Sequence, residues 1–180
     1  MAVLAEYLGS VDDTLNFGTS ARVAMGFKVP AGATIEGWGI VGSRGVPSTA
    51  GTFRVSIYET ISGNPDSGTL IKSEDYDRTV LPVYTTSPTL QSFTFTSPTG
   101  PLTGGTTQYY MMITNLTGSA SDNLRWSWDT TSPTYPDGNS WAFFSGSWNS
   151  YASIDSNFQI TGTEASGGFT KPNYLGFSRL

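Results

Sequence analysis

ARVAMGFKV, at residues 21–29, is the stretch that decides the fold class of this chain. Its odd-numbered positions are all apolar, whereas the positions between them include Arg22 and Lys28. Strict alternation over this length is typical of a β-strand with one buried face and one exposed face. The residues that follow, 30–32, read Pro-Ala-Gly and predict a turn.

The same two-residue period recurs outward from this stretch, while helical periodicity is nearly absent. Further strands are predicted at 35–41, 53–57, 69–73, 93–95, 109–113, 124–128, 141–144 and 158–160. Both faces of 109–113 are apolar, which indicates a central strand. Turn-forming segments rich in Gly, Pro and Asn, such as 63–68, separate the strands. The series predicts an all-β fold, an antiparallel jelly-roll β-sandwich of two sheets.

The composition narrows the chemistry that this fold could carry out. The chain contains no His and no Cys, which excludes triads built on His, Cys–His pairs and zinc sites made of these ligands. An immunoglobulin-like sandwich is the structural alternative, but it lacks its Cys…Trp…Cys pattern here. Paired carboxylates could hydrolyse glycosides, yet the glutamates are scattered among separate elements. We therefore predict that the protein is not an enzyme.

The charge of the chain narrows the class of partner. Fourteen acidic residues against nine basic ones give a formal net charge of −5, and the basic residues form no cluster. Nucleic-acid binding needs a basic patch, so we expect no nucleic-acid partner. No apolar run approaches the roughly 20 residues of a membrane span, so we expect no membrane partner. The opening residues also lack the basic region of a secretory signal, which favours a protein that is not exported.

Both ends of the chain differ from the domain between them. We predict an N-terminal arm at 1–16, the jelly-roll sandwich at 17–163, and a Gly-containing hinge with an apolar arm at 164–180. Each end either packs back on its own sandwich as an edge strand or docks as an arm on a neighbouring subunit. In the second case the partner-binding residues would be Leu4, Tyr7, Leu8, Phe169, Tyr174, Leu175 and Phe177.

The densest sequence feature is a set of aromatic residues between 126 and 148. Trp126 and Trp128 share one face of a predicted strand, as core residues should. Rings nearer to loops could instead form flat platforms for sugar rings, with polar neighbours for the hydroxyl groups. The candidate glycan-binding residues are Tyr135, Trp141, Trp148, Asp137 and Asn139. The alternative is that these side chains also fill the core.

Metal binding is a further alternative. Carboxylates and carbonyl groups are the ligands that calcium prefers, and the available aspartates are Asp12, Asp13, Asp122, Asp129, Asp137 and Asp155. Their spacing matches no EF-hand loop, so solvated loop aspartates are the favoured interpretation. We therefore predict no cofactor, with a structural calcium ion as the alternative. Asn115-Leu116-Thr117 also matches a glycosylation sequon, a triplet that is common by chance.

The order of motifs over residues 21–162 resembles a jelly-roll module that recurs in phage virion proteins and in bacterial secreted or surface proteins. The matching segments are VPAGATI at 29–35, FRVSIYET at 53–60, GNPDSGTLI at 63–71, FTFTSPTGPLTGGTTQYYMMI at 93–113, LRWSWDTTSPTYPDGNSW at 124–141, SGSW at 145–148 and NFQITG at 157–162. None of these segments is an enzyme signature. The resemblance therefore speaks to the fold first and to function second.

Two functions follow from this resemblance. One group of relatives decorates capsids, forms head fibres or sits in tails, which implies a decoration or cement protein on the outer capsid surface. Its partners would be the major capsid protein or other virion subunits, and further copies of itself, for instance in a trimer. The protein would then be made in the host cytoplasm. The other group resembles carbohydrate-binding modules, which implies a secreted glycan-binding module or a receptor-binding tip.

Overall fold

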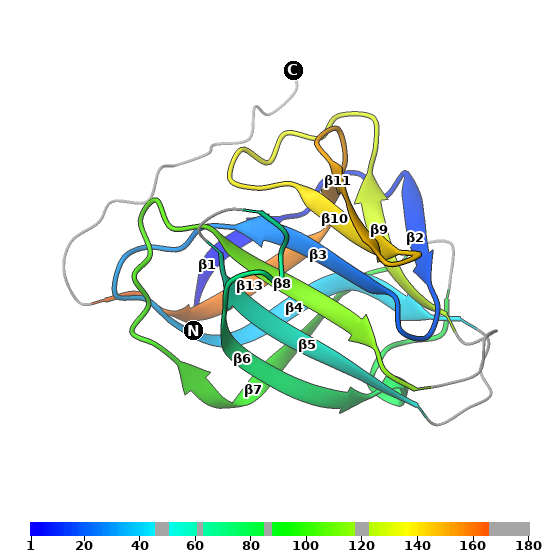
Figure 1. Cartoon of the computed structure of the whole chain (residues 1–180). Helices are drawn as coiled ribbons and strands as arrows, with labels where there is room; N and C mark the ends of the chain where they lie inside the picture. Colours follow the sequence, from blue (N-terminus) through cyan, green and yellow to red (C-terminus); the bar gives the residue numbers. More distant parts are fainter. Residues whose placement is uncertain (46–50, 61–62, 85–87, 118–122, 166–180) are drawn as a thin grey trace, which may run out of the picture.

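The computed structural model describes residues 1–45, 51–60, 63–84, 88–117 and 123–165. Over these residues the chain folds into two antiparallel β-sheets that pack on each other (Figure 1). The prediction of an all-β antiparallel sandwich is therefore confirmed. The helix in the described part is a single 3-10 turn, η1 (Arg78–Val80), and no helix there has the length and hydropathy of a membrane span.

The first sheet has six strands in the order β11-β10-β3-β8-β5-β6. Its members are β3 (Arg22–Phe27), β5 (Thr52–Glu59), β6 (Thr69–Asp77), β8 (Tyr109–Asn115), β10 (Ser140–Phe144) and β11 (Ser147–Tyr151). Strand β8 pairs with β3 on one side and with β5 on the other. This confirms the prediction that the doubly apolar stretch 109–113 forms a central strand.

The second sheet has seven strands, and β4 is its longest. Its members are β1 (Ala2–Tyr7), β2 (Asp13–Phe17), β4 (Thr34–Arg44), β7 (Leu90–Thr99), β9 (Leu124–Asp129), β12 (Asp155–Ser156) and β13 (Phe158–Thr163). Strand β4 pairs with both β13 and β7 over most of its length. Its last residues, Gly42 to Arg44, pair with β9 instead. Strand β4 thereby joins the two halves of this sheet.

Successive strands cross between the sheets from β2 to β5 and again from β6 to β10. Crossing of this kind is the connectivity expected of a jelly roll. Along one side of the sandwich, side chains of β6 reach the neighbouring edge strand β7. Lys72 Nζ donates to Ser97 Oγ at 3.0 Å, and Glu74 Oε2 accepts from the Thr96 amide at 3.0 Å. These contacts tie the edge of one sheet to the edge of the other.

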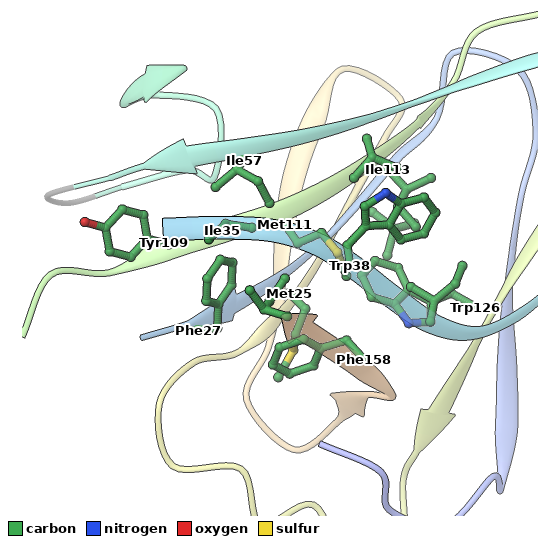
Figure 2. Close-up of a cluster of buried hydrophobic side chains, with 14 of the residues drawn as sticks. Met25, Phe27, Ile35, Trp38, Ile57, Tyr109, Met111, Ile113, Trp126 and Phe158 are labelled. Atoms are coloured by element: carbon green, nitrogen blue, oxygen red, sulfur yellow. The ribbon is translucent and has the colours of Figure 1, made fainter. Parts of the chain in front are cut away.

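The core lies between the sheets and takes alternate residues from both. Figure 2 shows Met25 and Phe27 of β3 beside Ile35 and Trp38 of β4, with side chains of β5, β8, β9 and β13 around them. Trp38 is 1% exposed. Its ring stacks on Phe93 at 4.4 Å between centroids. Its indole Nε1 donates to the Tyr76 hydroxyl at 3.0 Å, so this buried polar group is satisfied.

The N-terminal segment is part of the second sheet. Strand β1 pairs antiparallel with β13, and β2 pairs with β9. Of the two alternatives for residues 1–16, the edge strand is thus the arrangement found. Leu4 and Tyr7 pack against the core, while Leu8 is exposed. Phe169, Tyr174, Leu175 and Phe177 of the C-terminal arm lie outside the described residues.

Replacing Trp38 with alanine should lower the free energy of unfolding by about 3–5 kcal/mol, because the change leaves a large cavity in the centre of the core. Urea unfolding followed by far-UV circular dichroism measures this loss. Leu70→Ala is the matched control, since Leu70 is 50% exposed and its truncation should change stability by no more than about 0.5 kcal/mol. Equal losses in the two variants would contradict this description of the core.

Candidate functional site

The outer face of the six-stranded sheet gathers side chains that point away from the core. The strand register places Phe143, Arg22, Thr114, Arg54 and Asp75 in one row across β10, β3, β8, β5 and β6. Arg22 is half-buried and precedes the buried Val23 in β3, whereas Arg54 is exposed between two buried residues of β5, Phe53 and Val55. The alternation that builds the core therefore also sets these two cations on one surface.

Other residues of this face are apolar. Ala24, Tyr110 and Met112 form a buried cluster of their own, separate from the main core. Trp141 and Trp148 pack against this cluster and are half-buried. The rings of Tyr110 and Trp141 meet edge to face at 6.3 Å. The outer face is therefore an amphipathic surface and not a purely solvated one.

The turn at 63–68 folds over this surface and brings Asp66 onto it. Asp66 forms an ion pair with Arg22 and accepts a hydrogen bond from Trp148 Nε1 at 2.8 Å. The guanidinium of Arg22 lies 3.9 Å from the centroid of the Phe143 ring, in a cation–π contact. Arg22 is thus held by Asp66 and by the Phe143 ring, and its side chain has little freedom to move.

Arg54 is held by a second ion pair. Its Nε and Nη2 donate to the two carboxylate oxygens of Asp75 at 2.6 and 2.9 Å. This bidentate hydrogen bonding raises the pKa of Arg54 and lowers the pKa of Asp75. Both groups are therefore charged at neutral pH and fixed relative to each other.

A groove lies between the two arginines, and we call it the Arg22–Arg54 groove. Its volume is about 370 Å³. Its lining includes Ser56, Met112 and Thr114 of the central strands, together with Tyr58, Leu70 and the two arginines. The groove thus offers charged, hydroxyl and apolar groups within one concave surface.

The predicted glycan-binding residues do not form one site. Tyr135 turns toward the main core, where its ring meets Phe158 edge to face at 5.3 Å. Asp137 forms an ion pair with Lys28 at 3.3 Å. Asn139 is an exposed residue of the loop before β10, and its carbonyl accepts from the Gly26 amide at 3.0 Å.

Among the predicted aromatic candidates, Trp141 and Trp148 share the outer face of the six-stranded sheet. Trp126 is fully buried in the main core, which confirms the core interpretation for that residue. Trp128 is also buried, and its ring contacts Tyr151 at 5.3 Å. Arg22 and Arg54 were not predicted to belong to a site, although the alternation of their strands marks both as surface residues.

A second polar site surrounds Asp129 at the end of β9. The buried carboxylate accepts from the Tyr7 hydroxyl at 2.6 Å and from the amides of Ser10, Thr131 and Ser132 at 3.0–3.2 Å. Burial alone would raise the pKa of Asp129, but these hydrogen bonds outweigh it and leave the pKa lowered. The carboxylate thus ties the N-terminal segment to the loop after β9.

Asp155 lies beside this site, and its pKa is shifted in the opposite direction, above its usual value. Burial raises the pKa of Asp155, and the nearby charge of Asp129 raises it further. A backbone hydrogen bond from Tyr135, at 2.8 Å, partly opposes this rise. The two carboxylates therefore differ in pKa because one has many donors and the other has few.

Where the structure describes them, the aspartates considered as calcium ligands form hydrogen bonds within the chain. Among the described residues, no three or more His, Cys, Asp or Glu side chains gather as a metal would require. Asp129 and Asp12 instead accept hydrogen bonds from backbone amides of the loop at 130–132. Asp122 lies outside the part of the chain that the structure describes. The sequon is likewise inaccessible, because Asn115 is fully buried.

Comparison of the chain with protein-family models, with curated proteins and with solved structures finds no match. The candidate sites therefore rest on the geometry and chemistry of this chain alone.

Asp129→Asn should lower the free energy of unfolding at pH 7 by about 1–3 kcal/mol, because hydrogen bonds to a buried carboxylate are weakened. A lowered folded-state pKa stabilises the fold above the unfolded pKa of about 3.9, and this stabilisation is lost as the pH falls further. The difference between variant and wild type should therefore shrink below about pH 4. Asp155 has a raised pKa, so in both proteins its contribution to stability is present at low pH and is lost as the pH rises.

Urea unfolding at a series of pH values measures this difference. Asp13→Asn is the control, because Asp13 is an exposed neighbouring aspartate whose replacement should change stability by no more than about 0.5 kcal/mol. A difference between Asp129→Asn and wild type that stays constant from pH 7 to pH 3 would contradict the assignment.

Proposed function

We propose that this protein is a non-enzymatic structural protein of a phage virion, a capsid decoration or cement protein. In this role the sandwich sits on the outer capsid surface and stabilises the shell by bridging capsid subunits. The resemblance of residues 21–162 to a module of virion proteins supports the proposal. The structural observation that carries it is the position of the two chain ends.

Both ends leave the sandwich at the same place. Strand β1 is antiparallel to β13, so Ala2 lies opposite Gly162. Met1 is 74% exposed at this end of the strand pair. Strand β13 therefore ends on the side of the sandwich where the N-terminus lies (Figure 1). An arm that follows β13 starts on this side of the sandwich and can reach a neighbouring surface from it.

The proposed mechanism is mechanical. Apolar side chains of the C-terminal arm would contribute about 25 cal/mol for each Å² that they bury on the major capsid protein or another virion subunit. Repetition of the same contact over a lattice, with assembly into a homo-oligomer such as a trimer, multiplies the effective affinity. The two-sheet sandwich supplies a rigid body that needs no cofactor for this task.

Deletion of residues 167–180 should abolish association with particles and leave the sandwich folded, because the deleted segment follows the last strand. Co-sedimentation of the purified protein with particles that lack it measures association, and far-UV circular dichroism measures folding. The control is Leu70→Ala in the full chain, which should bind as wild type does. A truncated protein that decorates particles normally would show that the arm mechanism is wrong.

A carbohydrate-binding module or receptor-binding tip is the second candidate. It is favoured by Trp141 and Trp148, which lie half-buried together on the outer face of one sheet. Aromatic rings on such a face can pack against the C–H groups of sugar rings. This function is compatible with the first, because a protein on a virion surface can also attach to sugars.

Trp148→Ala should weaken glycan binding at least tenfold, because it removes both a ring and the donor that holds Asp66. A glycan array followed by titration calorimetry measures binding. Tyr84→Ala is the control, since Tyr84 is a 40% exposed aromatic residue away from this sheet. Failure of the wild-type protein to bind any glycan would rule out this second candidate.

A further inference from the structure

We propose that the Arg22–Arg54 groove is a binding site for a short neutral saccharide. The inference rests on the carbohydrate-binding candidate above and gives it a site, a ligand class and a ligand length. The groove residues differ from the candidates predicted from the sequence. Four observations support the proposal: its charge balance, its apolar lining, its size and its rigidity.

The charge balance of the groove favours an uncharged ligand. Each cation is already paired with a carboxylate, Arg22 with Asp66 and Arg54 with Asp75. A phosphate or a carboxylate ligand would have to compete with these partners and would meet their negative charge. The two pairs together carry no net charge, so the groove lacks the excess of positive charge that a phosphate or nucleic-acid ligand requires.

The same ion pairs suit hydroxyl groups. A hydroxyl group both donates and accepts hydrogen bonds, and it is best satisfied where donors and acceptors stand together. A guanidinium has five N–H donors, and the contact with Asp75 uses two of the nitrogen atoms of Arg54. The side chains of Arg54 and Asp75 are 45% and 44% exposed, so a ligand can reach both.

Apolar groups of the groove complement the C–H faces of a sugar ring. Met112 belongs to the buried cluster under the outer face, and Tyr58 packs against that cluster. Leu70 is opposite Tyr58 in the neighbouring strand and is half exposed. A ligand that is polar at its edges and apolar on its ring faces matches this arrangement, and a purely apolar or a purely ionic ligand does not.

The size of the groove suits a short ligand. Its volume of about 370 Å³ lies near the lower end of the roughly 300–1,000 Å³ of small-ligand sites. It therefore fits one or two sugar rings. Arg22 is held by Asp66 and by the Phe143 ring, and such fixed side chains lose little freedom when a ligand binds.

The test uses the full chain and an array of neutral and acidic glycans, followed by calorimetric titration with the best neutral ligand. Two variants are compared, Arg54→Ala and Leu70→Ser. Each removes one group from the groove without disturbing the core. Lys28→Ala is the matched control, because Lys28 forms a similar half-exposed ion pair with Asp137 outside the groove. Far-UV circular dichroism and thermal unfolding check that all variants are folded.

We expect the wild-type protein and Lys28→Ala to bind a neutral mono- or disaccharide with equal affinity. Arg54→Ala should bind roughly tenfold or more weakly, because a charged hydrogen-bond donor is lost, and Leu70→Ser should also bind more weakly. If both groove variants bind the neutral glycan as the wild-type protein does, the groove is not the binding site. The carbohydrate-binding candidate would then still stand. Binding restricted to acidic glycans, and weakened by salt, would overturn the ligand class.

Absence of binding to every glycan would overturn this inference together with the carbohydrate-binding candidate. It would leave the decoration function untouched. That function is tested by co-sedimentation with particles, and it depends on the C-terminal arm and not on the Arg22–Arg54 groove. We therefore expect Arg54→Ala to associate with particles as the wild-type protein does, whatever the outcome of the glycan experiment.

Discussion

Burial of every second side chain between two sheets is the constraint on which the rest of this molecule depends. Trp38 on β4 lies in the middle of that layer and contacts rings from β5, β6 and β7. Its hydrogen bond to Tyr76 satisfies a polar group that would otherwise destabilise the core. Once these inward positions are filled, the strand register fixes which residues face outward on both sheets.

The outer face of the six-stranded sheet is a direct product of that constraint. Arg22 and Arg54 stand on different strands, 32 positions apart in the numbering, yet pairing of both strands with β8 places Thr114 between them. Asp66 comes from a turn and reaches the same face. The groove therefore needs no sequence motif of its own, because it is assembled by register and by one folded turn.

Local alternation was enough to predict the sandwich and the central position of 109–113, but not the grouping of side chains across strands. Tyr135 and Trp148 are both aromatic residues near loops in the sequence, and only tertiary packing separates the inward ring from the outward one. Strand β11 was not predicted, because SWNSY shows no apolar alternation, and β2 was not predicted although Leu15 and Phe17 alternate with Thr14 and Asn16. The donors to Asp129 come from residues 7–10 and 131–132, a pairing that periodicity cannot reveal.

The pairing of β1 with β13 has a consequence for how the molecule would carry load. Among the described strands, β13 has a hydrogen-bonded neighbour on each side, β1 and β4, whereas β1 pairs with β13 alone. A pull along the chain from the end of β13 loads two ladders of hydrogen bonds in shear, so many bonds must break at once. A pull that lifts the first residues off the edge opens the β1 ladder one bond at a time, as a zipper does. The C-terminal end is therefore the stronger tether, and the N-terminal end is the one that peels.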